Sequence, residues 1–262
     1  MSKRRVLWPI LSLLLLVLPM QPTGVVADSS CEAPELICKA SSNQNQSLTM
    51  RDHCRYQQRA SVQLYKKEKS GERGKLDKNR ETTAIVEPAS QPDETGRYPV
   101  VTKVVSDTDD KGKNKNSVDP NARTILSLGA FFDIIFFPLL PEKIRYYEFK
   151  EVGSDRPGEK LYSFRPKTGA TQETLASGQV YINAESGAVL TIKVDTLHNL
   201  ELLDKNLKKL ENVYATVDYS EFDGKYRMPT FAKGGGSSDV KGFKGIFTFT
   251  FEESKYNQVL KL

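Results

Sequence analysis

Alternating apolar and polar positions mark a hairpin in the second half of the chain, from Ser177 to Asp195. Val180 and Ile182 alternate with polar neighbours before the turn, and the same period of two returns over 189–195. Residues 183–187 supply the turn formers between the two runs. This pattern predicts two antiparallel strands, each with one buried face.

The same period recurs along most of the chain and predicts a mainly β protein. Asp223-Gly224 is a strong hairpin signal, whereas 66–78 is interpreted as a hairpin tip and the glycine-rich run 234–238 as a flexible tip. Pro229 is expected at a sheet edge or a bulge. We count about ten strands and one or two helices, and the even strand spacing favours a curved antiparallel sheet that tends toward a barrel. The further strands are predicted at 57–65, 81–87, 98–105, 143–152, 161–166, 210–221, 226–232 and 243–251.

The strand predicted at 243–251 places aromatic rings on one face. Phe243, Phe247, Phe249 and Phe251 alternate with polar residues, and Gly245 leaves a gap in the row. Four buried rings contribute roughly 6–12 kcal/mol before the opposing costs are counted. Such a face must meet either a core or an apolar ligand.

The most apolar segment after the N-terminus is residues 124–140, which holds four phenylalanines and one charge, Asp133. Its apolar residues repeat at helical spacing, and it is too short to span a bilayer. Two interpretations stay open: a core helix, or a lid or plug over an apolar cavity.

The N-terminus has the three parts of a secretory signal peptide: basic residues at 3–5, an apolar run at 6–20 and small residues before a cut expected after Ala27. A retained membrane anchor is the alternative. The mature chain is therefore expected in the periplasm or secreted. Residues 28–54 are interpreted as a polar leader with a short helix at 47–56, capped by Ser47 or Thr49, and 55–262 as one β domain.

The charge balance and the cysteines bear on nucleic-acid binding, disulfide formation and metal binding. The formal net charge of +5 falls to +2 when residues 1–27, with three basic and no acidic side chains, are removed. That balance gives no case for nucleic acid. In an exported protein a disulfide is expected, either Cys31–Cys38 or Cys38–Cys54, with one thiol left over. His53 beside Cys54 fits no standard zinc spacing, so no metal is expected.

Residues 106–122 contain almost no apolar side chains and are expected to form a mobile loop. A calcium site on its aspartates is disfavoured by Lys111, Lys113 and Lys115. No nucleophile or phosphate-loop motif occurs, and the two histidines, His53 and His198, lie in unrelated contexts. We therefore expect neither an enzyme nor a cofactor. The pair Glu252-Glu253 is interpreted as solvated.

The hairpin sequence Gly178-Gln-Val-Tyr-Ile-Asn-Ala-Glu-Ser-Gly187 resembles a motif of the LolA/LolB lipoprotein carriers and their RseB-type periplasmic relatives. It departs from that motif by Asn183, where the family usually has aspartate. The similarity continues through Tyr219, Asp223-Gly224 and Met228-Pro229 to the aromatic strand, and it covers about 143–256.

The resemblance implies an unclosed barrel around a helical lid, with acyl chains held on the concave face. It offers no position for the carriers' lid-locking arginine. We expect a monomer that binds a lipid or an acylated protein, as a carrier or sensor, with envelope proteins as further partners. The alternative is an envelope interaction protein with a self-filled barrel, and a hydrolase ranks third. The predicted lipid-binding residues are Phe131, Phe132, Ile135, Phe136, Phe137, Phe243, Phe247, Phe249 and Phe251.

Overall fold

A computed structural model describes residues 31–94, 96–109 and 129–262, and the side chains of the last range from Phe131 onward. The expected signal peptide, its cleavage site and residues 110–128 lie outside these ranges. The chain from Cys31 to Leu262 forms one compact unit. No helix built from the described residues is both long enough and apolar enough to cross a bilayer.

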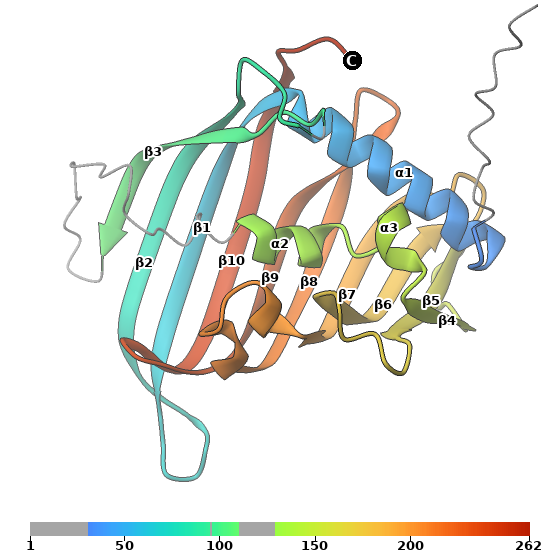
Figure 1. The fold of residues 1–262 in the computed structure, drawn as a ribbon. Helices are drawn as coiled ribbons and strands as arrows, with labels where there is room; N and C mark the ends of the chain where they lie inside the picture. Colours follow the sequence, from blue (N-terminus) through green and yellow to red (C-terminus); the bar gives the residue numbers. More distant parts are fainter. Residues whose placement is uncertain (1–30, 95, 110–128) are drawn as a thin grey trace, which may run out of the picture. The chain divides into compact units, whose positions relative to one another are not determined.

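Ten antiparallel strands form one sheet in the order β3-β2-β1-β10-β9-β8-β7-β6-β5-β4 (Figure 1). The first and last strands pair in its interior, and β3 and β4 form its two edges, so the sheet is not closed. The predicted half-open antiparallel barrel is confirmed. The strands are β1 (Cys54–Lys67), β2 (Arg73–Pro88), β3 (Val100–Asp109), β4 (Tyr147–Val152), β5 (Glu159–Pro166), β6 (Leu175–Asn183), β7 (Val189–His198), β8 (Leu210–Phe222), β9 (Tyr226–Val240) and β10 (Phe243–Gln258).

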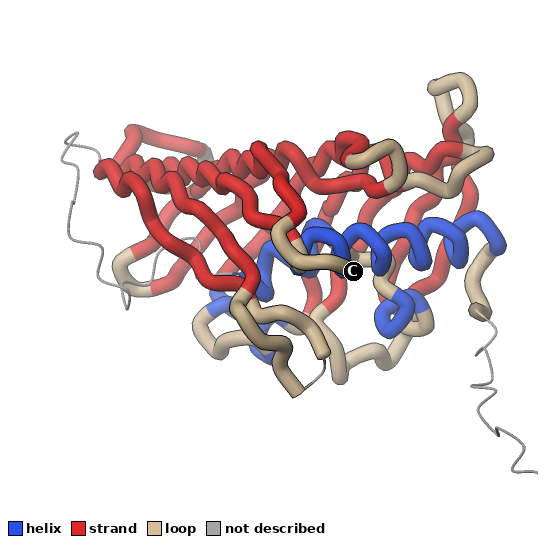
Figure 2. Tube along the Cα trace, turned by 90° about the horizontal axis from the view of Figure 1, so that it is seen from above, coloured by secondary structure: helices blue, strands red, loops and turns tan. Residues whose placement is uncertain are grey.

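The helices lie on the concave side of the bent sheet (Figure 2). They are α1 (Glu35–Asp52), α2 (Gly129–Phe136) and α3 (Pro141–Ile144), with two 3-10 turns, η2 (Leu200–Leu202) and η3 (Leu207–Lys209), between β7 and β8. The helical segment expected at 124–140 is thus shorter, because its described part is helical only to Phe136 and Pro138 cannot continue a helix. The connection 199–209 between β7 and β8 contains the two 3-10 turns.

The central hairpin forms as predicted, and its motif residues have identifiable tasks. The Asn183 side-chain oxygen accepts hydrogen bonds from the backbone N–H groups of Glu185 and Ser186, at 3.1 and 2.8 Å, so asparagine performs the turn-forming role of aspartate. Gly187 has φ +68°, which suits glycine. At Gly178 a Cβ atom would lie 1.9 Å from a carbonyl oxygen of β7, so only glycine fits there.

The prediction that the first part of the leader, 28–46, is loose is wrong, because α1 begins at Glu35 and continues to Asp52. Its buried positions follow helical spacing, but many are polar: Gln44, Ser47 and Arg51 lie on the same face as Ile37 and Ala40. A polar face of this kind hides the hydrophobic periodicity of a core helix. The expected caps are also wrong, since the helix begins after Pro34 and Ser47 accepts a hydrogen bond from the backbone of β9.

One of the two expected disulfides forms: it links Cys31, which precedes α1, to Cys38, which lies in the first turn of the helix. Cys54 is the remaining thiol and is buried. Burial raises the pKa of this thiol to about 11, so Cys54 is protonated at neutral pH.

The glycine run at 234–236 is part of β9 and not a flexible tip, which corrects the prediction. All three residues pair with β10, Gly234 and Gly235 also pair with β8, and all three are buried. A Cβ at Gly234 would lie 2.7 Å from the Phe249 ring, and one at Gly236 would lie 3.0 Å from the Phe247 ring. The glycines therefore give the β10 rings room to lie against the sheet backbone.

The pairing of the strands places three predicted features more exactly. The strand expected to close the sheet, β10, lies in its middle, because β1 pairs with it. Pro229 lies beside a shift in register between β8 and β9, which confirms the bulge and excludes the edge. The first four residues of the expected loop 106–122 belong to β3.

Candidate functional site

Aromatic rings from α2 and β10 meet on the concave side of the sheet. The Phe132 ring stacks on Phe251 with centroids 4.6 Å apart and contacts Phe249 edge-on at 5.9 Å. Phe136 lies 5.1 Å from Phe251. These spacings are those of directly packed aromatic pairs. The rings of α2 therefore fill the space next to the β10 rings.

The structure brings together eight of the nine predicted lipid-binding residues as buried side chains and leaves Phe243 partly buried at the end of the cluster, in contact with Phe247. Their role in binding a lipid stays a prediction. The alternation that grouped the β10 rings is confirmed, because Phe247, Phe249 and Phe251 share the concave face. We call this set the ring cluster: Phe131, Phe132, Ile135, Phe136, Phe137, Phe243, Phe247, Phe249 and Phe251.

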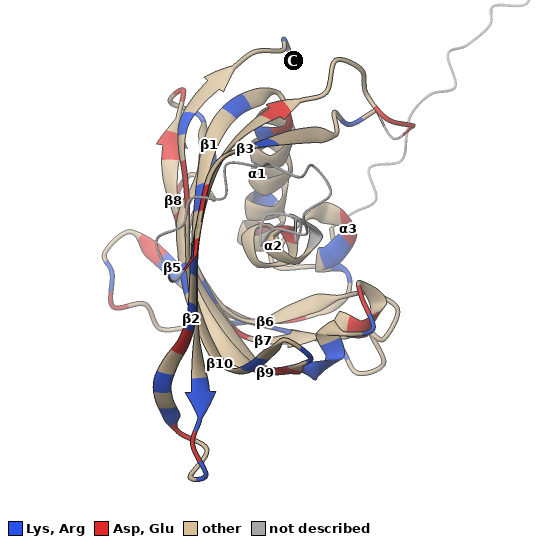
Figure 3. Cartoon of the chain, turned by 90° about the vertical axis from the view of Figure 1, so that its left-hand side faces the viewer, with Lys and Arg blue, Asp and Glu red and all other residues tan. Residues whose placement is uncertain are grey.

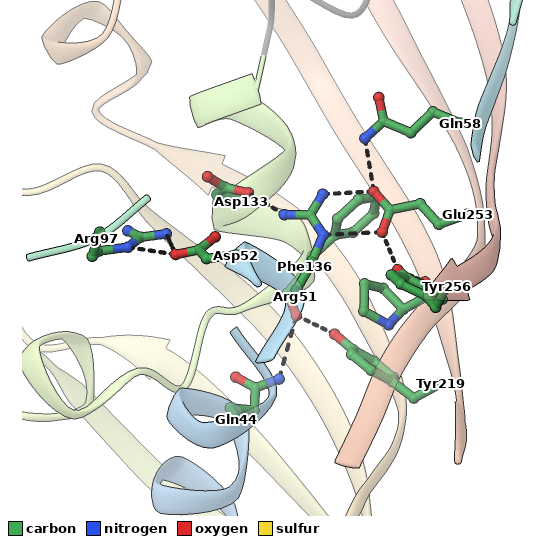
Figure 4. A network of polar contacts seen from close by, with 11 residues as sticks. Gln44, Arg51, Asp52, Gln58, Arg97, Asp133, Phe136, Tyr219, Glu253 and Tyr256 are labelled. Atoms are coloured by element: carbon green, nitrogen blue, oxygen red, sulfur yellow. Dashed lines mark hydrogen bonds and ion pairs between the residues drawn. The ribbon is translucent and has the colours of Figure 1, made fainter. Parts of the chain in front are cut away.

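A buried ion pair lies beside the ring cluster and joins α1 to β10 (Figure 4). Arg51 donates to both carboxylate oxygens of Glu253, at 3.0 and 2.5 Å, and the two side chains are 9% and 1% exposed. Gln58 and Tyr256 also donate to Glu253. Burial disfavours the charge on Arg51, but Glu253 together with Tyr56 and Asp133 outweighs that effect, so the pKa of the guanidinium lies above its ordinary value.

Arg51 also connects this pair to α2. Its Nη1 lies 3.4 Å from Asp133 Oδ1, and Asp133 is the one charged residue of the helix. The Asp133 side chain keeps 44% of its exposure, so this contact lies at the rim of the site. Partial removal from water raises the pKa of Asp133 more than Arg51 lowers it.

The C-terminal end of α2 is held by a second set of hydrogen bonds. The Phe136 carbonyl oxygen accepts from Gln44 of α1 at 3.3 Å and from the Tyr219 hydroxyl of β8. The Gln44 side-chain oxygen accepts from the Leu139 N–H at 3.0 Å. The Gln44 amide therefore satisfies both a buried carbonyl at the end of α2 and the backbone N–H of Leu139 after the helix.

A recess of about 260 Å³ opens beside the Arg51–Asp133 contact. Its walls come from α1, β1 to β3 and α2, and they include the ion pair Arg97–Asp52, with Nη2 2.6 Å from Oδ2. Burial raises the pKa of Asp52, and Arg97 offsets part of that rise. The recess is thus polar and charged, unlike the neighbouring ring cluster.

Sequence reasoning missed most of this polar network. Glu253 was predicted to be solvated with Glu252, but it is buried and paired, whereas Glu252 is exposed. No arginine was assigned to this region, and Arg51 lies between α1, α2 and β10. The sequence does carry a signal for this helix face: Ile37, Gln44 and Arg51 follow one another at intervals of seven residues, which is two helical turns.

The described residues contain no cluster of three or more metal-ligating side chains. His198 Nε2 lies 3.1 Å from Ser177 Oγ, and burial lowers the pKa of its imidazole. Within the described ranges no carboxylate accompanies this pair as a hydrogen-bond partner. His53 is instead engaged with the Thr49 carbonyl of its own helix.

No protein-family profile and no curated protein sequence matches the chain. Among solved structures, a domain named for outer membrane lipoprotein sorting from Vibrio parahaemolyticus is 9% identical, with TM-score 0.32, and 85% of this chain and 94% of that one are covered. The LolA superfamily protein NE2245 from Nitrosomonas europaea is 11% identical, with the same TM-score and coverage. MucB, solved with periplasmic MucA, is 10% identical with TM-score 0.19, covering 82% and 94%. These titles agree with the family resemblance of the hairpin, and at such identities and TM-scores they add no argument about function.

Proposed function

We propose that this protein is a non-enzymatic envelope carrier or sensor that binds an acyl chain on its concave face, with α2 as a displaceable lid. The observation that carries the proposal is the ring cluster, in which an eight-residue helix covers an aromatic sheet face. Rings of α2 pack against Phe249 and Phe251, and a chain bound on this face would need the space that they fill. Binding therefore requires α2 to move.

The free energy lost when the α2 side chains are exposed is comparable to the free energy gained when an acyl chain is buried in their place. Exposing the four buried side chains of α2, which are Phe131, Phe132, Ile135 and Phe136, costs about 6–12 kcal/mol, whereas burying sixteen methylenes returns about 13 kcal/mol. A chain of eight methylenes returns only about 6 kcal/mol, which falls at the lower limit of that cost. The proposal thus predicts a preference for long chains over short ones.

The attachment of α2 is compatible with such a movement. Its charged contact with the rest of the protein is Arg51–Asp133, at 3.4 Å and partly exposed, whereas Arg51–Glu253 joins α1 to the sheet and stays intact when α2 leaves. The polar hold at Phe136 fixes only the end of the helix. A hinge near Phe136 then lets the helix swing while the sheet keeps its shape.

Titration with a fluorescent long-chain fatty acid tests this proposal. Phe132→Ala weakens the shut state and should increase the apparent affinity, because the fraction of binding-competent protein rises. Phe251→Asp places a charge in the wall of the site and should abolish binding. The matched control is Tyr214→Asp, since Tyr214 is 51% exposed and lies outside the ring cluster.

Opposite effects of the lid and wall substitutions would support a site beneath α2. If Phe132→Ala leaves binding unchanged while its far-UV circular dichroism matches the parent, α2 does not compete with the ligand and the lid is refuted. If Tyr214→Asp reduces binding as much as Phe251→Asp, the ligand is not held by the ring cluster.

The direct ring contacts also favour a second candidate, an envelope interaction protein whose concave face is permanently filled by its own side chains. Export by the predicted signal peptide is common to both proposals. Native mass spectrometry of protein purified from its own envelope separates them. A co-purified lipid supports the carrier or sensor, and a mass equal to the bare chain, together with no fatty-acid uptake, supports the interaction protein.

A further inference from the structure

We infer that one end of the sheet is a docking surface for an anionic lipid bilayer. Three segments form this surface, which we call the basic rim: the β1–β2 ribbon at 66–78, the η2–η3 segment at 200–209 and the β9–β10 turn at 239–244. The inference is independent of the acyl-chain proposal, because Phe243 is the one residue that these segments share with the ring cluster.

The three segments lie at the same end of the molecule (Figure 1). The β1–β2 ribbon projects beyond the neighbouring strand ends, and positions of Lys and Arg lie along it together with fewer Asp and Glu (Figure 3). Lys78 Nζ donates to the Gly242 carbonyl oxygen at 2.7 Å, which connects the ribbon to the β9–β10 turn. Leu210, directly after η3, pairs with Ser238 directly before that turn.

Positive charge is concentrated on the basic rim. Its residues include eleven Lys or Arg and six Asp or Glu, whereas the rest of the chain from Cys31 has 24 basic and 26 acidic side chains. The rim thus carries +5 and the remainder −2. A positive surface on an otherwise slightly negative protein orients it toward a negatively charged membrane.

Most of the rim cations are free to meet lipid phosphates. Lys66 and Lys244 lie near Asp77 and Asp239, at 3.9 and 3.1 Å. For Lys67, Lys69 and Lys75, in contrast, no ion pair occurs within the described part of the chain, and all three are exposed. Their positive charges are therefore not neutralised by the protein.

Exposed apolar side chains among these lysines favour a bilayer over a soluble polyanion. Leu76 is 44% exposed on the ribbon, and Leu202 and Leu203 are 52% and 39% exposed on the η2–η3 segment. Lysines that contact headgroups beside leucines that enter the acyl boundary are the combination found in interfacial membrane binding. A polysaccharide or nucleic acid would use the lysines and leave the leucines in water.

Co-sedimentation of the intact protein with vesicles tests the docking surface. The probes are vesicles of pure phosphatidylcholine and vesicles with about 30% phosphatidylglycerol, at low and high salt. We expect binding only to the anionic vesicles, and a steep loss of affinity as salt screens the charges. Binding of equal strength to both vesicle types would overturn the inference.

Matched charge-reversal variants separate the rim from the overall charge. Each Lys or Arg near an anionic surface contributes about fivefold in affinity, so K67E/K69E/K75E should weaken vesicle binding by at least about a hundredfold. The control K167E/K225E/K261E changes the net charge equally at exposed positions outside the rim and should stay within about threefold of the parent. Equal losses in the two triple variants would refute a localised docking surface.

The variant L76S/L202S decides between a bilayer and a soluble polyanion. We expect it to weaken binding to anionic vesicles and to leave any binding to dextran sulfate unchanged. If it leaves vesicle binding unchanged, and dextran sulfate binds the parent as tightly as vesicles do, the rim is a polyanion site and the bilayer proposal fails. Acyl-chain titration of the same variants should match the parent, because the ring cluster is intact.

Discussion

Removing Arg51 should destabilise the protein far more than removing an ordinary surface arginine. Arg51→Met leaves the Glu253 carboxylate, whose side chain is 1% exposed, with Gln58 and Tyr256 as its remaining donors. Breaking a buried ion pair from one side costs about 3–5 kcal/mol. For a domain of this size each kcal/mol lowers Tm by roughly 2–4 °C, so the expected loss is roughly 6–20 °C.

A double-mutant cycle measures the pair itself. Glu253→Gln alone leaves Arg51 buried with only the 3.4 Å contact to Asp133 and should also destabilise the protein. The double variant R51M/E253Q removes both charges, so its loss should be smaller than the sum of the two single losses by about 1–3 kcal/mol.

Urea unfolding followed by far-UV circular dichroism is the suitable assay, because the chain's single tryptophan lies at position 8, ahead of the described residues. Arg59→Met is the matched control, since Arg59 pairs with Glu81 at 2.9 Å while both side chains are about half exposed. Its cost should stay below about 1 kcal/mol. If R51M costs no more than R59M, or if the losses in the cycle add without interaction, the buried pair is not what holds α1 to β10.

Three further predictions concern the hairpin, the lid and the N-terminal crosslink. Gly178→Ala should prevent a stable fold, because its Cβ would lie 1.9 Å from a backbone oxygen of β7. The control Gly153→Ala should leave Tm nearly unchanged, because no atom lies within 4 Å of the Cβ position there. Soluble yield and thermal melts compare the two variants. The pKa of Asp133 is raised in the folded state, so the folded protein binds the proton more tightly than the unfolded chain does. The stability of the parent relative to Asp133→Asn should therefore rise as the pH falls from neutral toward the ordinary aspartate pKa. A constant difference between the two proteins in urea unfolding across that pH range would contradict the shift. Replacing Cys31 and Cys38 by serine reopens a loop of sequence separation 7 and should cost about 2.5 kcal/mol, and a parent that unfolds at the same urea concentration with and without reductant would refute this.

Local patterns in the sequence were sufficient for most of the sheet. The period of two placed the central hairpin, and it also grouped Phe247, Phe249 and Phe251 on one face. Strand alternation and turn chemistry depend on residues a few positions apart, so they can be read without knowing the partners of a segment. The same argument predicted a curved antiparallel sheet, whereas the helical segment inside its curve was implied by the resemblance to the lipoprotein carriers.

The tertiary structure decided the features whose partners are distant in the chain. Glu253 is buried because Arg51, 202 positions away, neutralises it, and no local pattern distinguishes it from exposed Glu252. The glycines at 234–236 become strand because two neighbouring strands pair with them and the β10 rings cover them. Likewise α1 is a polar sequence that folds as a helix against the sheet. Burial of polar groups depends on partners that satisfy them, and only the folded chain supplies those partners.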